Sequence, residues 1–407
     1  MFSHKTILRT ALLILALTAL QPQARAQKKE MAQAKTSIKS GKNLAEAEKL
    51  MTTLLQDTAN RTNTKIWLLL FETVKKQYEQ ANEKFYLHQS ADTTALFKAA
   101  RRMFEVAEQF DSIDAAPRAD GQVEPKYRRK HADYLSPYRP NLLNGGLYFL
   151  GKQDFPTAYE FLDTYIGCAS APLFSDFRYA ENDRQLSRAA QLTVYCGLKQ
   201  QRPDLALRHA ELARRDTEHQ EALLQYLAEV YKLQGDTAAY VSTLREGFTL
   251  APRSLYFFPH LFDHYFHRSD LTAAEALCDS ALQVAPTDVV FRFAKSSVLL
   301  SQTRYAECIA LSDSLIAQND SLADAYLNAG LSYYYQGTAI ENNTRTARAQ
   351  RQQMLGYYRQ ALPYLQRYRT LQPETIDQWG LPLYTIYLNL NMGKEFDEVD
   401  RLLKSRK

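Results

Sequence analysis

Three histidines are the residues whose type and spacing come closest to a chemical site. His260, His264 and His267 recur at i, i+4 and i+7, so a helix would carry them on one stripe of its surface. Imidazole nitrogens bind transition metals, and Asp263 and Asp270 lie nearby in the sequence. No matching ligand cluster occurs in the neighbouring segments, so we predict no metal and no cofactor. The three histidines stay weak metal candidates, with ordinary surface or packing roles as the alternative.

The rest of the chain contains no recognisable catalytic signature. The sequence patterns of serine hydrolases, zinc proteases and phosphate-binding glycine loops are absent. With only 14 glycines, the chain also has little material for loops that wrap phosphate groups. We therefore expect a protein that is not an enzyme.

The four cysteines are too few and too scattered for a disulfide scaffold. Cys168, Cys196, Cys278 and Cys308 include no C-x-x-C pair that would indicate zinc binding or thiol exchange. Two interpretations stay open: a single bridge between Cys278 and Cys308, or four small apolar residues in the core.

Residues 1–26 have the composition of a secretory signal peptide. Lys5 and Arg9 form a basic start, residues 11–20 are apolar, and Ala24 and Ala26 occupy the small-residue positions before a cleavage site. The apolar run is about half as long as a membrane span, so we predict export and cleavage. The segment holds three basic and no acidic residues, and its removal lowers the formal net charge from +5 to +2. So small a charge argues against nucleic acid as a partner.

A repeat in the sequence predicts the helices on which any functional site must lie. Pro252 and Pro286 lie 34 residues apart, and residues 255–286 hold two amphipathic helical patterns. The same pattern can be laid over most of the chain. Two helices in each period of this length are typical of a stacked helical solenoid, so the predicted fold is all-α.

The predicted organisation has three parts after the signal peptide. Residues 27–112 form degenerate helical pairs, residues 113–140 a proline-rich linker or excursion, and residues 141–407 the repeat array. One repeat is extended at residues 338–356. The excursion holds a basic run at residues 126–130, for which an anion-binding patch and an ordinary solvated cluster are the alternatives.

One repeat shows the order of large and small residues most clearly. Its first helix carries Tyr326, Ala329, Gly330 and Tyr333, and its second carries Tyr358, Ala361, Leu365 and the later Pro373. This order resembles the tetratricopeptide repeat (TPR), and the whole chain is similar to exported TPR proteins of Bacteroidota. The resemblance implies a right-handed α-α superhelix of about eight to nine helix pairs. It departs at Pro259, which should kink a first helix or mark its late start.

The resemblance also implies a binding surface. TPR proteins present certain first-helix positions on a concave wall, and carried over unit by unit these are Tyr256, Phe266, His267, Phe293, Leu327, Leu331, Tyr334 and Tyr335. So many aromatic side chains would suit an extended peptide, an amphipathic helix or stacked sugar rings. Because the chain has 26 tyrosines, a place in the core between repeats is an equal expectation for many of these residues.

The expected function is a non-catalytic exported scaffold that binds a protein or peptide partner on its concave face. The resemblance implies a location in the periplasm or at the periplasmic face of the outer membrane, with outer-membrane association as a further expectation. The alternative is a glycan-binding accessory protein for outer-membrane nutrient uptake. Against this alternative, no lipid-attachment cysteine follows the apolar run of the signal peptide.

Overall fold

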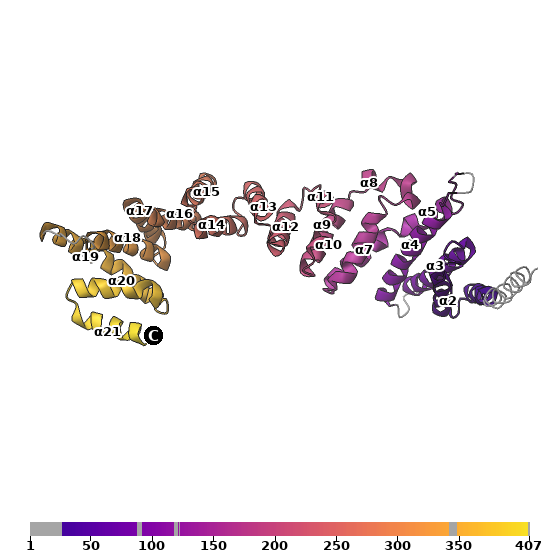
Figure 1. The fold of residues 1–407 in the computed structure, drawn as a ribbon, viewed down its shortest axis with the longest axis horizontal. Coiled ribbons are helices and arrows are strands. Elements are labelled where there is room, and N and C mark those ends of the chain that lie inside the picture. The colour runs from indigo at the N-terminus through magenta and orange to yellow at the C-terminus, as the bar shows by residue number, and fades with distance from the viewer. Residues whose placement is uncertain (1–26, 88–91, 118–120, 122, 342–347, 406–407) are drawn as a thin grey trace, which may run out of the picture. The chain divides into compact units, whose positions relative to one another are not determined.

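The computed structural model describes residues 27–87, 92–117, 121, 123–341 and 348–405. The predicted signal peptide, residues 1–26, lies outside them. Helices and turns make up these residues, and no strand occurs within them. The predicted all-α fold is confirmed, because neighbouring helices stack in pairs as in a TPR-like solenoid (Figure 1). The chain forms two compact units, of which unit 1 ends at Gly235 and unit 2 runs from Asp236.

Unit 1 begins with helical residues 27–40. The elements that follow are α2 (Leu44–Gln56), α3 (Thr64–Tyr86), α4 (Thr93–Asp114), α5 (Arg128–Leu135), the 3-10 helix η1 (Ser136–Tyr138), α6 (Pro140–Gly151), α7 (Phe155–Gly167), η2 (Pro172–Phe177), α8 (Tyr179–Asn182), α9 (Leu186–Lys199), α10 (Pro203–Leu207), α11 (Ala210–Ala213) and α12 (Gln220–Gln234). Each long helix packs against the next, so the core runs continuously along the stack.

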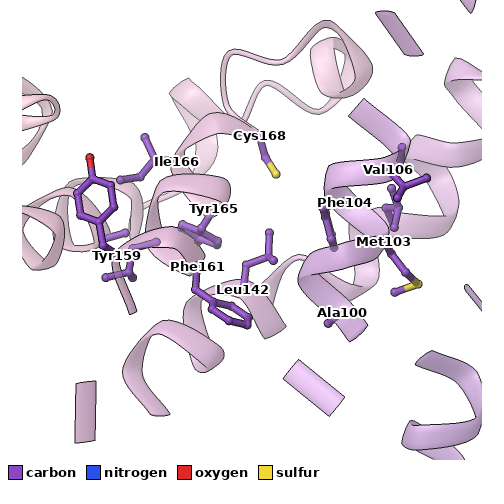
Figure 2. Close-up of a cluster of buried hydrophobic side chains, with 14 of the residues drawn as sticks. Ala100, Met103, Phe104, Val106, Leu142, Tyr159, Phe161, Tyr165, Ile166 and Cys168 are labelled. Carbon is purple, nitrogen blue, oxygen red and sulfur yellow. The ribbon is translucent and has the colours of Figure 1, made fainter. Parts of the chain in front are cut away.

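The core of unit 1 is built by apolar stripes on α4, α6 and α7 (Figure 2). Phe104, Leu142 and Phe161 are fully buried there. The helices α6 and α7 approach closely because α6 carries Gly145 and Gly146 at the contact. A Cβ atom at Gly145 would lie 2.6 Å from the ring of Phe161, so a larger residue would force the pair apart.

The predicted linker or excursion contains helical structure packed on unit 1. Residues 128–138 form α5 and η1, and His131 on α5 is only 2% exposed. Arg128, a member of the basic run, holds Asp111 of α4 with both its Nε and Nη2 atoms, the latter at 2.8 Å. This guanidinium is therefore committed to an internal ion pair.

Unit 2 repeats a helix pair whose helices range from 11 residues in α14 to 24 in α19. After α13 (Thr237–Leu250) come the pairs α14 (Phe257–His267) and α15 (Leu271–Val284), α16 (Val289–Ser301) and α17 (Tyr305–Gln318), α18 (Ala323–Glu341) and α19 (Arg348–Leu371), and α20 (Ile376–Asn389) and α21 (Gly393–Lys404). The expected extension at residues 338–356 falls on the end of α18 and the start of α19. We call α14, α16, α18 and α20 the first helices of unit 2.

The first helices of several pairs end in the same turn. Gln153, Ser269, Thr303 and Asn391 have φ between 58° and 60°, in the left-handed region. In each case the N–H of the next residue donates to a carbonyl five residues back, as from Arg304 to Leu299 at 2.9 Å. This is the hydrogen-bond pattern of a Schellman motif, which satisfies carbonyls at the helix end. The turn fixes the short connection to the second helix.

The structure shows the roles of the cysteines and of Pro259, and it bears on membrane-spanning helices. All four cysteines are buried free thiols, so Cys278 and Cys308 are core residues without a mutual bridge. Pro259 marks a late helix start, because it lies in the first turn of α14, where its missing N–H leaves no bond unmade. No helix among the described residues is long and apolar enough to cross a membrane.

Candidate functional site

A ladder of phenylalanine rings on α14 leads from the core to the surface of unit 2. Phe258, Phe262 and Phe266 lie one helical turn apart, and their rings stack at centroid distances of 6.0 Å and 5.2 Å. Phe258 is buried and contacts Phe291 of α16 at 4.5 Å, whereas Phe262 and Phe266 are half-buried. The predicted site residue Phe266 is thus held by packing while part of its ring stays open to solvent.

Other predicted site residues lie partly open on the next first helices. Phe293 on α16 and Leu331 on α18 are half-buried, and Tyr335 on α18 is 41% exposed. The Tyr335 ring lies 6.4 Å from that of Tyr305. Burial, aided by nearby Tyr334, raises the pKa of Tyr335, so its hydroxyl stays protonated at neutral pH and can donate a hydrogen bond.

The structure places two predicted wall residues in the core instead. Leu327 and Tyr334 belong to the buried cluster that joins α18, α19 and α20. The Tyr334 ring stacks on Tyr358 of α19 at 6.1 Å, and its hydroxyl lies 3.5 Å from Oγ1 of Thr385 on α20. These side chains are therefore packing residues, and the structure does not bring them together with Phe266 on the open surface.

Tyr256 and the three histidines lie in three different environments. Tyr256 is the residue before α14, and its carbonyl accepts a 2.7 Å hydrogen bond from Nδ1 of His260, whose ring lies 4.3 Å from the Tyr256 ring. His264 is half-buried beside two arginines, and His267 is exposed. Within the described part of the chain, no group of three His, Cys, Asp or Glu side chains is placed to hold a metal ion.

Unit 1 contains a buried ionic cluster that the sequence did not reveal. Arg139, 5% exposed, forms a 2.7 Å ion pair with Asp183, and its guanidinium lies between the rings of Tyr165 and Tyr179 at 3.8 Å and 4.0 Å. Burial opposes the charge of Asp183, but hydrogen bonds from Tyr165 and Arg139 hold its pKa below the ordinary value. Because every charge is paired inside the fold, the cluster fastens the η2 and α8 connection to α6 and α7.

A second carboxyl group with a shifted pKa lies on α4 of unit 1. Glu108 of α4 is half-buried, and the thiol of Cys168 donates to its Oε1 across 3.9 Å. Burial raises the pKa of Glu108 to about 7, and the nearby carboxylates of Glu105, Asp111 and Asp163 act in the same direction. The Cys168 pKa is raised by burial as well, so this thiol stays protonated and is a poor nucleophile.

Sequence reasoning missed Phe262, although its spacing from Phe258 and Phe266 was visible. The period of four residues would have identified it. It missed Arg139 for a different reason, since the partner Asp183 is remote in the chain and only the fold brings the two together.

Neither a protein-family model nor a curated protein sequence matches this chain. Among solved structures, the chain is similar to the C-terminal part of a TPR repeat-containing protein from Cytophaga hutchinsonii, with 10% identity over 63% of this chain and 92% of that one, and a TM-score of 0.43. It is also similar to the P58(IPK) TPR domain, with 13% identity over 94% of this chain and 99% of that one, and a TM-score of 0.26. A third similar structure is the TPR2AB domain of yeast Sti1 in complex with pHSP90, with 12% identity over 65% and 99% of the two chains and a TM-score of 0.23. All three neighbours are TPR proteins.

Proposed function

We propose that this chain is an exported, non-catalytic scaffold that binds a protein or peptide partner on the first helices of unit 2. The observation that carries the proposal is a set of three half-buried phenylalanine rings on two first helices of unit 2: Phe262 and Phe266, which stack on each other on α14, and Phe293 on α16. A phenylalanine in the core would have its whole ring buried. An ordinary solvated surface would seldom expose three phenylalanine rings on neighbouring helices.

Half-buried rings are well suited to capture a partner. Phe262 and Phe266 are stacked on each other and on buried Phe258, so they lose little conformational freedom when a ligand covers them. Aromatic anchors of this kind supply much of the binding free energy at protein interfaces. Tyr335 adds a hydroxyl donor on α18, which an extended or helical peptide can use for register.

Export and periplasmic location are part of the same proposal. The basic start, the apolar run and the two alanines near Gln27 support a cleaved signal peptide. With the similarity to exported TPR proteins of Bacteroidota, this favours a place in the periplasm or at the periplasmic face of the outer membrane. N-terminal sequencing of protein recovered from the periplasmic fraction should give a chain that begins at Gln27, and a chain that keeps residues 1–26 in the cytoplasm would contradict export.

The binding proposal is tested with matched surface variants. Proteins captured by the wild-type chain from its native host are identified, and the dissociation constant of each purified partner is measured for Phe266→Ala, Phe262→Ala and the control Val284→Ala. Val284 is also an exposed apolar residue of unit 2 but lies on the second helix α15. We expect either phenylalanine variant to weaken binding about tenfold or more, as loss of an aromatic anchor does, and the control to bind like the wild type.

Two outcomes would contradict the proposal. In the first, all three variants bind a purified partner equally well, so the partner uses another surface. In the second, no protein binds but defined oligosaccharides do, and Phe266→Ala abolishes that binding. The second outcome would show that the same phenylalanine rings bind glycan, and it would favour the alternative function of a glycan-binding accessory protein.

A further inference from the structure

A groove of about 660 Å³ opens between α13 and the end of α14, entirely within unit 2. Its polar lining includes Arg245 and Ser242 of α13, and Arg268, His264 and Tyr265 at the end of α14. The groove lies apart from the phenylalanine ladder, because Tyr265 and His264 point toward α13 whereas Phe262 and Phe266 lie on another face of the helix. Nothing in the proposed scaffold function uses it.

The two arginines of the groove are not paired with the one carboxylate that lines it. Among the described residues, neither Arg245 nor Arg268 has a carboxylate oxygen within ion-pair distance of its guanidinium. Asp270 also lines the groove, but its Oδ1 accepts the N–H of Ala273 at 3.1 Å as the N-cap of α15. In the described part of the chain, the hydrogen-bond partner of the Arg245 guanidinium is neutral: its Nε donates to the hydroxyl of Tyr265 at 2.7 Å.

A groove in unit 1 shows what a neutralised arginine pair looks like. That groove, of about 550 Å³, also contains two arginines, on α4. Each of them is paired with a glutamate: Arg101 with Glu105 at 3.1 Å, and Arg102 with Glu48 at 2.8 Å. The groove beside α14 therefore differs in its charge balance, because its two arginines face one carboxylate, Asp270, and neither forms an ion pair with it.

His264 is exposed to the positive potential of the same two arginines. Burial and the positive charges of Arg268 and Arg245 hold the pKa of His264 below its ordinary value, and only Asp270 acts in the opposite direction. An anion placed between the guanidinium groups would remove the electrostatic part of this effect, so it would raise the pKa of His264. By linkage, the anion would then bind more tightly as the pH falls and His264 becomes protonated.

We propose that this groove is a binding site for an organic oxyanion, a phosphate or carboxylate group attached to an apolar body. The forked N–H groups of Arg245 and Arg268 match either oxyanion, and the hydroxyls of Ser242 and Thr237 supply further donors. Val241 and Ala238 form an apolar wall beside them. The volume of the groove is in the range of sites for small organic ligands and exceeds what an inorganic ion would fill.

The test is calorimetric titration of the full chain at low ionic strength with three probes: inorganic phosphate, phenyl phosphate and benzoate. We expect an aromatic oxyanion to bind more tightly than inorganic phosphate, and a preference for phenyl phosphate or for benzoate will identify the headgroup. Arg268→Gln should weaken binding about tenfold or more, because a charge-assisted bidentate contact is lost. The control Arg253→Gln removes an exposed arginine of unit 2 that donates to the Val284 carbonyl and does not line the groove, and it should bind like the wild type.

A second measurement distinguishes binding of the probe in the groove from a general electrostatic effect of the probe on the protein. The imidazole C–H resonances of His264, assigned with His264→Gln, should titrate at a higher pH when the probe is saturating, and this shift should disappear in Arg268→Gln. Arg268 is exposed, and its side chain forms no hydrogen bond or ion pair with the part of the chain that the structure describes, so its variant should fold normally. The proposal is overturned if no probe binds, if Arg268→Gln binds as well as the wild type, or if saturating probe leaves the His264 titration unmoved.

Discussion

Glu108 offers the sharpest test of the packing in unit 1, because its half-buried carboxyl group has a raised pKa and should make stability depend on pH. The fold raises the pKa of Glu108 from the ordinary 4.5 to about 7, first through burial. The unfolded chain therefore loses this proton earlier than the folded chain as pH rises. The stability contribution of the protonated group is fully present below about pH 4.5 and is lost as the pH rises through about 7.

Glu108→Gln keeps the shape of the protonated side chain and removes the charge. A difference of about 2.5 pKa units corresponds to ~3 kcal/mol, so above pH 7 the variant should be more stable than the wild type by about that amount. At pH 4.5 and below, where both proteins carry a neutral side chain, the difference should nearly vanish.

Urea unfolding can be followed in unit 1 alone. Of the two tryptophans, Trp67 lies in unit 1 and Trp379 in unit 2. Trp67 fluorescence in a Trp379→Phe background therefore reports the relevant transition. The control is Glu48→Gln on α2, whose carboxylate pairs with Arg102 at 2.8 Å, so removal of its charge should not stabilise the protein at any pH. The reasoning would be refuted if Glu108→Gln were less stable than the wild type at pH 8. It would also be refuted if the variant had the same stability advantage over the wild type at pH 4.5 as at pH 8.

Three further changes test other parts of the fold by chemical unfolding. Thr303→Gly should stabilise unit 2 by roughly 0.5–1 kcal/mol, because Thr303 is β-branched and has φ 60°, and unchanged or lower stability would contradict this. Tyr334→Ala should destabilise unit 2 by about 3 kcal/mol, whereas half-buried Phe266→Ala should cost only about 1 kcal/mol; equal costs would show that Phe266 is also a core residue. His131→Phe should remove an acid-dependent loss of stability: burial lowers the pKa of His131 to about 4 from 6.5, so the wild type loses about 3 kcal/mol from this group as the pH falls from 6.5 to 4. Parallel pH profiles of the two proteins would contradict the assignment.

The helix pairs could be predicted because their signals are local. Pro252 and Pro286 mark the period, and the apolar spacing within each unit identifies the helices. The turn between the helices could not be read in the same way, since Thr303 and Gln153 occupy left-handed positions for which glycine is the usual signal. There the tertiary stacking of the helices overrides the preference of the residue.

The candidate site was harder to predict than the fold, because one residue of rotation decides between core and surface. Tyr334 and Tyr335 are adjacent and chemically identical, yet the first packs on Tyr358 and the second is 41% exposed. A helix turns by about 100° per residue, so the rotation of α18 about its axis must be known to within less than 100° to tell a core residue from its exposed neighbour. In α18 both faces carry apolar residues, and the pattern alone does not set the angle.

The three histidines show why a stripe on one helix does not make a metal site. Residues at i and i+7 share a face but lie roughly 10 Å apart along the axis, so one ion cannot reach His260 and His267 together. A metal site on α14 would need ligands from a neighbouring element. The element packed beside His264 supplies Arg245 instead, and the end of α14 adds Arg268. Two guanidinium groups against the single carboxylate of Asp270 repel a metal cation and attract an anion, so the same histidine that first indicated metal chemistry is better placed to respond to an oxyanion.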